Sequence, residues 1–153
     1  MILFIQYILV TIIVFAGLIA GTIISKLAIE ELKIGKKWFT ITKNGLAAIA
    51  LGALLIKFHI AIPIIITIAL FTLLTFKPAP NHWLYIAASV FLPISASNDN
   101  IFFAQATLIF LLGTVIAALS YNQKKKFKPN LKLILKEHVY FLIIAVLFYF
   151  ILY

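Results

Sequence analysis

A run of 23 residues without a charged side chain, Ile2 to Ile24, lies near the beginning of this sequence. As a helix it would be about 34 Å long at about 1.5 Å per residue, which is enough to cross a hydrocarbon core of about 30 Å. A backbone inside lipid must satisfy its own hydrogen bonds, so only helices and closed barrels can span. Barrel strands alternate apolar and polar residues, whereas Ile64, Ile65 and Ile66 are consecutive. We therefore predict an all-α, polytopic helical membrane bundle that forms one domain over residues 1–153.

Composition supports a membrane protein and excludes several kinds of chemistry. Hydrophobic residues make up 65% of the chain and charged residues 11%, whereas soluble domains have about 45–50% and about 25%. The first run is too long for a signal peptide and lacks its basic start, so we expect a true span. The chain has no cysteine, which excludes disulfides, thiolate nucleophiles and cysteine zinc sites.

The number of spans depends on the 38 residues from Phe39 to Phe76. One straight helix of that length would measure about 57 Å, so we favour two helices that meet at Lys57–His59, which gives about six spans. The alternative is four spans, with a kinked middle and a re-entrant segment at Leu84–Ile94. Phe76-Lys77-Pro78 recurs as Phe127-Lys128-Pro129. The recurrence indicates either a weak repeat of three helices in each half, 1–76 and 77–153, or only the proline, lysine and aromatic residues that interfacial segments share.

Lysine sets the predicted orientation. The formal net charge is +9, and all thirteen basic residues are lysine. In the six-span arrangement twelve of them share one face. By the positive-inside rule that face is cytoplasmic in the cell membrane and both termini lie outside. We therefore expect the basic charge to meet the lipid bilayer and not nucleic acid. The predicted contacts with anionic lipid headgroups are Lys33, Lys36, Lys37, Lys124, Lys125 and Lys126. An aromatic belt is expected at the same face, at Trp38, Trp83, Tyr85, Tyr121 and Tyr140.

The segment EELKIGKKWF, Glu30 to Phe39, is the most charged stretch in the first half of the chain. We interpret it as a hinge at the membrane surface, in which Trp38 anchors the chain and Gly35 can break the helix. The alternative is a docking element or a headgroup site. The pattern Glu-Glu-Leu-x-x-Gly-Lys-Lys-aromatic-Phe after a first span resembles uncharacterised small polytopic membrane proteins of archaea. That resemblance covers some ten residues and implies no activity.

Two further features are candidate sites. Gly17 and Gly21 form a small-xxx-small face that allows close helix approach, either between two copies of the chain or within one. Lys57 and His59 would lie at membrane depth in the four-span arrangement, where an ionisable group is a candidate for transport or proton relay. In the six-span arrangement they would lie in a wet turn.

No motif in the sequence identifies a reaction. There is no phosphate-binding loop and no nucleophile elbow, and three histidines without a spacing pattern do not indicate a metal site. We expect no cofactor. His82 and His138 are expected at the interface, and Asn81 and Asn130 are expected to cap helices. The favoured function is a non-catalytic packing, scaffold or assembly component of a homo- or hetero-oligomer. The alternatives are a small transporter or channel subunit, and a lipid-modifying enzyme that uses Glu30, Glu31, His82 or His138.

Overall fold

The computed structural model describes residues 2–57 and 80–153, and every regular element in those ranges is a helix. The helices are α1 (Phe4–Leu27), α2 (Ile29–Lys57), α4 (Asn81–Ser95), α5 (Asp99–Ser120), α6 (Phe127–His138) and α7 (Tyr140–Leu152). This confirms the predicted all-α helical bundle.

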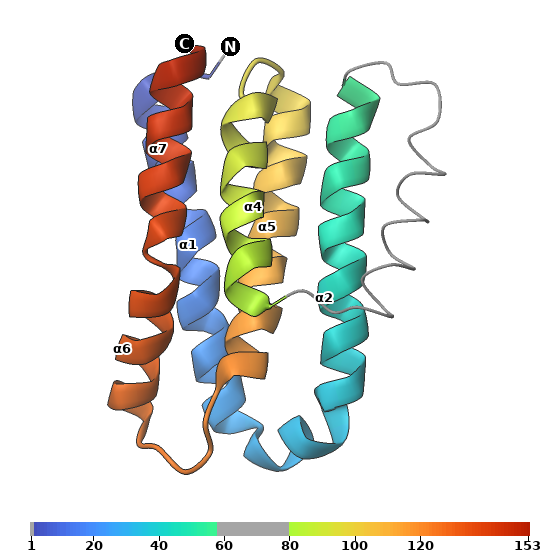
Figure 1. Cartoon of the computed structure of the whole chain (residues 1–153), viewed down its shortest axis with the longest axis vertical. Coiled ribbons are helices and arrows are strands. Elements are labelled where there is room, and N and C mark those ends of the chain that lie inside the picture. The colour runs from blue at the N-terminus through green and yellow to red at the C-terminus, as the bar shows by residue number, and fades with distance from the viewer. Residues whose placement is uncertain (1, 58–79) are drawn as a thin grey trace.

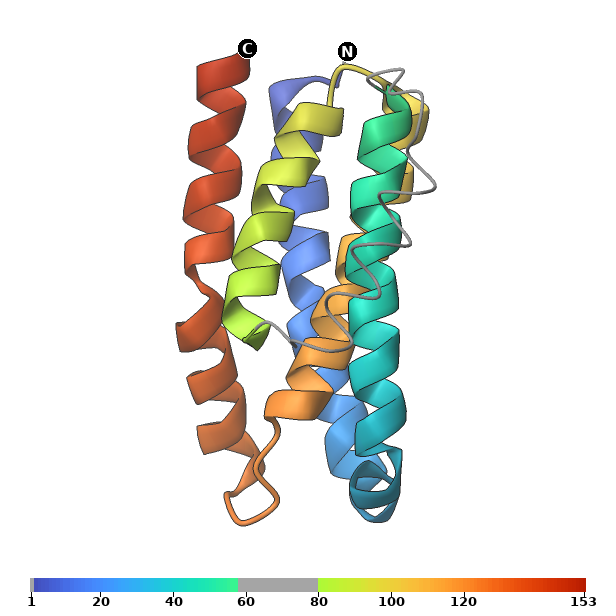
Figure 2. The same cartoon turned by 45° about the vertical axis from the view of Figure 1, so that its right-hand side comes forward.

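The helices run up and down along one common direction, and both termini lie at the same end of the bundle (Figure 1). The turn from α1 to α2 and the loop from α5 to α6 lie at the opposite end, which we call the lysine end because it carries Lys26, Lys36 and Lys124–Lys126. Helix α5 packs against α1, α2 and α4, and α4 also packs against α7. Figure 2 shows the same arrangement turned by 45° about the vertical axis.

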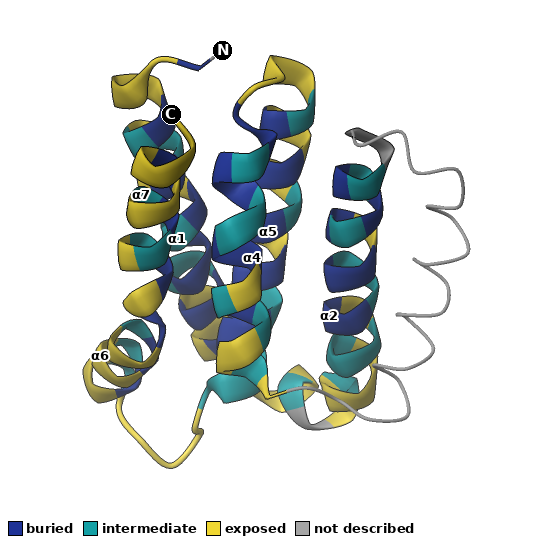
Figure 3. Ribbon diagram, turned by 45° about the horizontal axis from the view of Figure 1, so that its top comes forward, coloured by how far each residue is buried: buried dark blue, intermediate teal, exposed yellow. Residues whose placement is uncertain are grey.

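Four stretches of helix in the described ranges are long and apolar enough to cross a membrane. They are Phe4–Leu27, Ile34–Leu55, Asp99–Ser120 and Phe127–Leu152. Large apolar side chains on their outer faces are exposed, for example Ile5 and Ile151, each at 73%. Figure 3 shows that exposed positions mark the outward faces of the helices, while buried positions face the middle of the bundle. Such faces suit lipid, which solvates apolar side chains.

The number of membrane spans depends partly on residues that the structure does not describe. Helix α2 ends at the same end of the bundle as the termini, and α4 begins nearer the lysine end (Figure 1). Helix α4 has 15 residues, or about 22 Å, which is shorter than the hydrocarbon core. The choice between six and four spans, and the boundary between the predicted halves, fall within residues 58–79, outside the described residues.

The predicted hinge is more helical than expected. Only Ala28 separates α1 from α2. The charged segment from Glu30 to Phe39, which was predicted to be a hinge, is therefore helical and lies at the beginning of α2. Gly35 does not break the helix, and that prediction is wrong. The ring of Phe39, one turn later, lies 3.0 Å from where a Cβ of Gly35 would be. The Phe39 ring therefore packs over the backbone of Gly35.

Candidate functional site

The lysine end carries a cluster of exposed cations on two separate segments. Lys36 and Lys37 lie near the start of α2, and Lys124, Lys125 and Lys126 lie in the loop before α6; all five are exposed. Lys33 lies in α2 between Glu30 and Lys36. The fold thus places the predicted headgroup contacts at one end of the bundle, although they are distant in sequence.

Asn130 holds the basic loop in shape. Its side-chain amide donates to the carbonyls of Asn122, at 2.8 Å, and Lys125, at 3.1 Å. Its Oδ1 accepts from the backbone N–H of Asn122 at 3.1 Å. The prediction that Asn130 caps the last helix is wrong, because α6 already begins at Phe127. The side chain reaches back to the loop, where it bonds to three backbone groups.

A chain of polar side chains lies just inside the lysine end. Lys43 of α2 is only 3% exposed, and its Nζ donates to Oδ1 of Asn81 at 3.1 Å. The amide of Asn81 donates in turn to Oγ of Ser120 at 3.3 Å. The chain joins α2, α4 and α5. Asn81 was predicted to cap a helix beginning at His82, but α4 begins at Asn81, and Pro80 occupies the cap position.

The sequence places Lys43 among the lysines expected on the cytoplasmic face and does not predict that it is buried. A signal was present, since Lys43 and Asn44 interrupt the apolar residues of Ile34–Leu55. A cation inside a span is costly and is commonly functional. A buried lysine and a lysine that extends to the surface look the same in sequence. The hydrogen bond that distinguishes Lys43 is made to Asn81, which lies 38 positions away in sequence.

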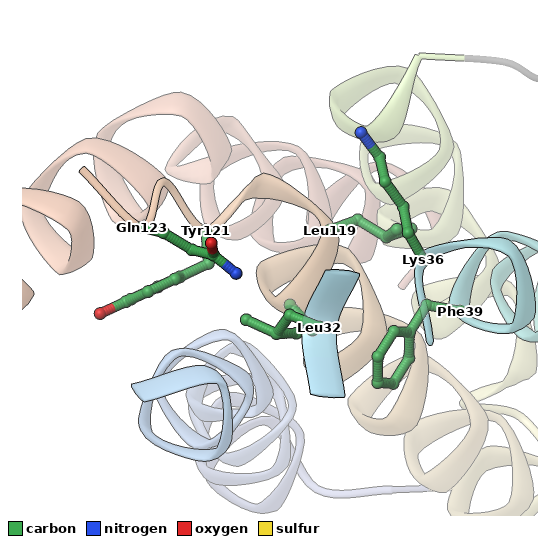
Figure 4. A pocket seen from close by; sticks show the side chains of 7 residues that line it. Leu32, Lys36, Phe39, Leu119, Tyr121 and Gln123 are labelled. Atoms are coloured by element: carbon green, nitrogen blue, oxygen red, sulfur yellow. The ribbon is translucent and has the colours of Figure 1, made fainter. Parts of the chain in front are cut away.

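A cavity of about 200 Å³ opens at the lysine end between the start of α2 and the end of α5. Gln123 closes one side, because its amide donates to the carbonyl of Ile29 at 2.9 Å. Figure 4 shows Lys36 extending away from Leu32 and Phe39. The described residues that line the cavity are Leu32, Lys36, Phe39, Ala118, Leu119, Tyr121 and Gln123.

Three buried tyrosines bind helices together through their hydroxyl groups. Tyr7 donates to the carbonyl of Ala145 at 2.8 Å, and Tyr149 donates to that of Ile2 at 3.0 Å. Tyr85 donates to the carbonyl of Val14 at 3.2 Å. The prediction that Tyr85 belongs to the interfacial belt is wrong, since its exposed fraction is 0%. The belt residues Trp38, Trp83 and Tyr140 are exposed at 70%, 61% and 58%.

His138 is buried as well, which corrects its predicted interfacial position. Its exposed fraction is 1%, its Nδ1 lies 2.8 Å from the carbonyl of Ile134, and its ring meets the edge of Tyr85 with centroids 5.6 Å apart. Nε2 has no hydrogen-bond partner among the described residues. His82 is exposed at the start of α4.

Gly17 and Gly21 face α5 of the same chain. A Cβ added at Gly17 would overlap the carbonyl oxygen of Phe110, and one at Gly21 would overlap that of Thr114. The two backbones therefore touch along this face. This is the intrachain alternative for the glycine pair, and the face is already occupied in the folded chain.

The remaining predicted sites gain little from the structure. Lys57 is the last residue of α2, and His59 lies outside the described residues. Glu30 and Glu31 are exposed in the first turn of α2, where no metal-binding group of three or more histidine or acidic residues exists among the described residues.

Comparisons with protein-family models, with curated proteins and with solved structures found no match.

Proposed function

We propose that this chain is a non-catalytic structural component of a membrane assembly. The observation that carries the proposal is where the buried hydroxyl groups are directed. Tyr7, Tyr85 and Tyr149 donate to carbonyls of distant segments. Further buried hydroxyls donate to carbonyls of their own helix, as seen at Thr11, Thr22, Ser25, Ser89 and Ser95. Side chains that bind substrate would have to face a cavity, whereas these face the backbone, and those of the three tyrosines join segments that are distant in sequence.

The lysine end supports an orientation in which it meets the cytoplasmic leaflet. Exposed lysines near an anionic surface contribute on the order of 1 kcal/mol each, and positive loops favour the cytoplasmic side. In this proposal the basic end anchors the bundle at the headgroups, and both termini lie outside. The apolar outer faces are then available to lipid and to neighbouring subunits.

Photo-crosslinking in native membranes tests the assembly role. A photoreactive phenylalanine analogue replaces Ile49 of α2, Phe103 of α5 or Leu147 of α7, which are exposed at 53%, 55% and 55%. Phe102, which is fully buried, is the matched control for Phe103. We expect a protein adduct from at least one outward position and none from Phe102. Lipid adducts alone, together with a particle containing a single 17.1 kDa chain after mild extraction, would contradict the proposal.

A transporter or channel subunit is the second candidate, favoured by the interior position of Lys43 and its link to Asn81 and Ser120. Its test is ion flux in proteoliposomes. Proton or anion flux that the wild-type protein carries and Lys43→Met abolishes, while Lys37→Met retains it, would favour this role. The same flux in all three proteins would count against it.

A further inference from the structure

The cavity at the lysine end lies where apolar stretches of helix give way to charged residues. On α5 the candidate span ends at Ser120, between Leu119 and Tyr121. On α2 the exposed Lys36 and Lys37 precede the long apolar part of the helix. A molecule in this cavity would have one part beside the spans and another beyond them. Only an amphipathic ligand matches both environments.

The residues that line the cavity are likewise divided into an apolar part and a polar part. Leu32, Phe39 and Leu119 provide an apolar surface, and Lys36, Tyr121 and Gln123 provide polar groups at the edge. Figure 4 shows the ammonium of Lys36 and the hydroxyl of Tyr121 pointing away from Leu32 and Phe39. The amide of Gln123 is already bonded to Ile29, so the strongest polar group at the edge is the cation of Lys36.

Charge indicates the sign of the ligand's polar part. Lys36 is exposed, and the neighbouring Lys37 and the loop Lys124–Lys126 add positive charge at the same end of the bundle. An anion is attracted to such an end before it reaches any one residue. A neutral headgroup would gain no such attraction, and a free anion would leave the apolar wall exposed.

We propose that this cavity binds one anionic phospholipid, whose phosphate contacts the ammonium of Lys36 while the start of an acyl chain lies against Leu32, Phe39 and Leu119. This differs from the general attraction of lysines to a charged surface, because it assigns one lipid to one lysine and one cavity. It goes beyond the proposed assembly role, and it rests on the proposed orientation of the lysine end toward the headgroups.

Native mass spectrometry of the full chain tests the site. The delipidated protein is titrated with phosphatidylglycerol or with phosphatidylcholine of the same chain length. We expect one phosphatidylglycerol to bind with clear preference. Lys36→Gln should weaken that first binding event by about fivefold, the effect of about 1 kcal/mol. Lys37→Gln removes the same charge one residue away, outside the lining, and should change it by less than about twofold. Equal losses in both variants would show diffuse attraction only and overturn the proposal.

A second pair of variants tests the apolar part without changing charge. Leu32→Trp fills the cavity and should abolish the preferred single lipid, whereas Ile34→Trp adds the same bulk at a side chain that is 85% exposed and should retain it. Circular dichroism checks that the helices persist. Inorganic phosphate distinguishes the two sources of the anion. If phosphate alone raises the melting temperature in wild type but not in Lys36→Gln, as strongly as the lipid does, the site binds an anion and not a lipid.

Discussion

The hydroxyl of Tyr85 donates a hydrogen bond to the backbone carbonyl of Val14 over 3.2 Å, which joins α4 to α1 inside the bundle. The same ring stacks on Phe141 of α7 with centroids 4.4 Å apart. It also lies against Gly113 of α5, where an added Cβ would come within 3.0 Å of the hydroxyl oxygen. One side chain of α4 therefore contacts three other helices.

Replacing Tyr85 by phenylalanine removes only this hydrogen bond. We expect a loss of about 1 kcal/mol in the free energy of unfolding, the usual size for a buried bond between membrane helices. Thermal unfolding in detergent, followed by circular dichroism, measures it. Tyr140→Phe is the control, because Tyr140 is 58% exposed. Equal melting temperatures for the two variants would show that the bond to Val14 contributes nothing.

Substitution of Gly21 by alanine should be much more damaging. The new Cβ would overlap the carbonyl oxygen of Thr114, so α1 and α5 must separate, at a cost of about 1–3 kcal/mol or more. Denaturant titration of the purified protein measures the loss. Gly35→Ala provides the contrast, since it meets only the ring of Phe39 and gains about 1 kcal/mol in helix propensity. A Gly21→Ala protein as stable as Gly35→Ala would contradict the close approach of α1 and α5.

Asn81→Leu should destabilise the lysine end. It removes one acceptor of Lys43 and the donor of the bond to Ser120, and loss of a hydrogen bond to a buried polar group costs about 1–3 kcal/mol. Hydrogen exchange should rise first around Lys43 in α2, at the start of α4 and at the end of α5. Asn100→Leu, at an exposed position in the first turn of α5, makes the same chemical change and should leave exchange at the lysine end unaltered. Similar exchange in both variants would argue against the polar chain.

We expect His138 to stabilise the bundle through the packing of its ring and not through its hydrogen bonds. Nε2 has no hydrogen-bond partner among the described residues, and Nδ1 contacts only the carbonyl of Ile134 in the same helix. His138→Phe should therefore change the free energy of unfolding by less than about 1.5 kcal/mol. His138→Ala leaves a hole beside Tyr85 and should lose about 2–4 kcal/mol. Chemical denaturation of the two variants separates these outcomes. A large loss in His138→Phe would mean that the imidazole nitrogens matter, and a buried polar role would replace the packing role.

The predicted orientation can be tested by labelling, since the chain has no cysteine of its own. Ser97→Cys lies in the loop between α4 and α5, and Lys125→Cys lies in the loop between α5 and α6, both at exposed positions. In intact cells a membrane-impermeant maleimide should react with position 97 and not with position 125. Permeabilised cells should label both. The reverse pattern would place the lysine end outside.

Sequence was a good guide to the helices and a poor guide to which side of each helix is interior. In a soluble protein the buried face is apolar and the outer face polar, so periodicity separates them. Here both faces are apolar, because lipid is as apolar as the core. Thus Tyr85 and Tyr140 look alike in sequence, yet one is fully buried and the other exposed. His138 was misplaced for the same reason. The hydrogen bonds that join Lys43, Asn81 and Ser120 connect distant segments of the chain. Neither hydropathy nor the distribution of charge along the sequence predicts such contacts.

The close contact of α1 with α5 also has a consequence for how the chain is made. Helix α1 enters the membrane early, but the carbonyls that fill its glycine face belong to Phe110 and Thr114, which are synthesised much later. Until then a face suited to tight helix pairing faces the bilayer. The tight packing of the first helix is therefore completed only after α5 has been made.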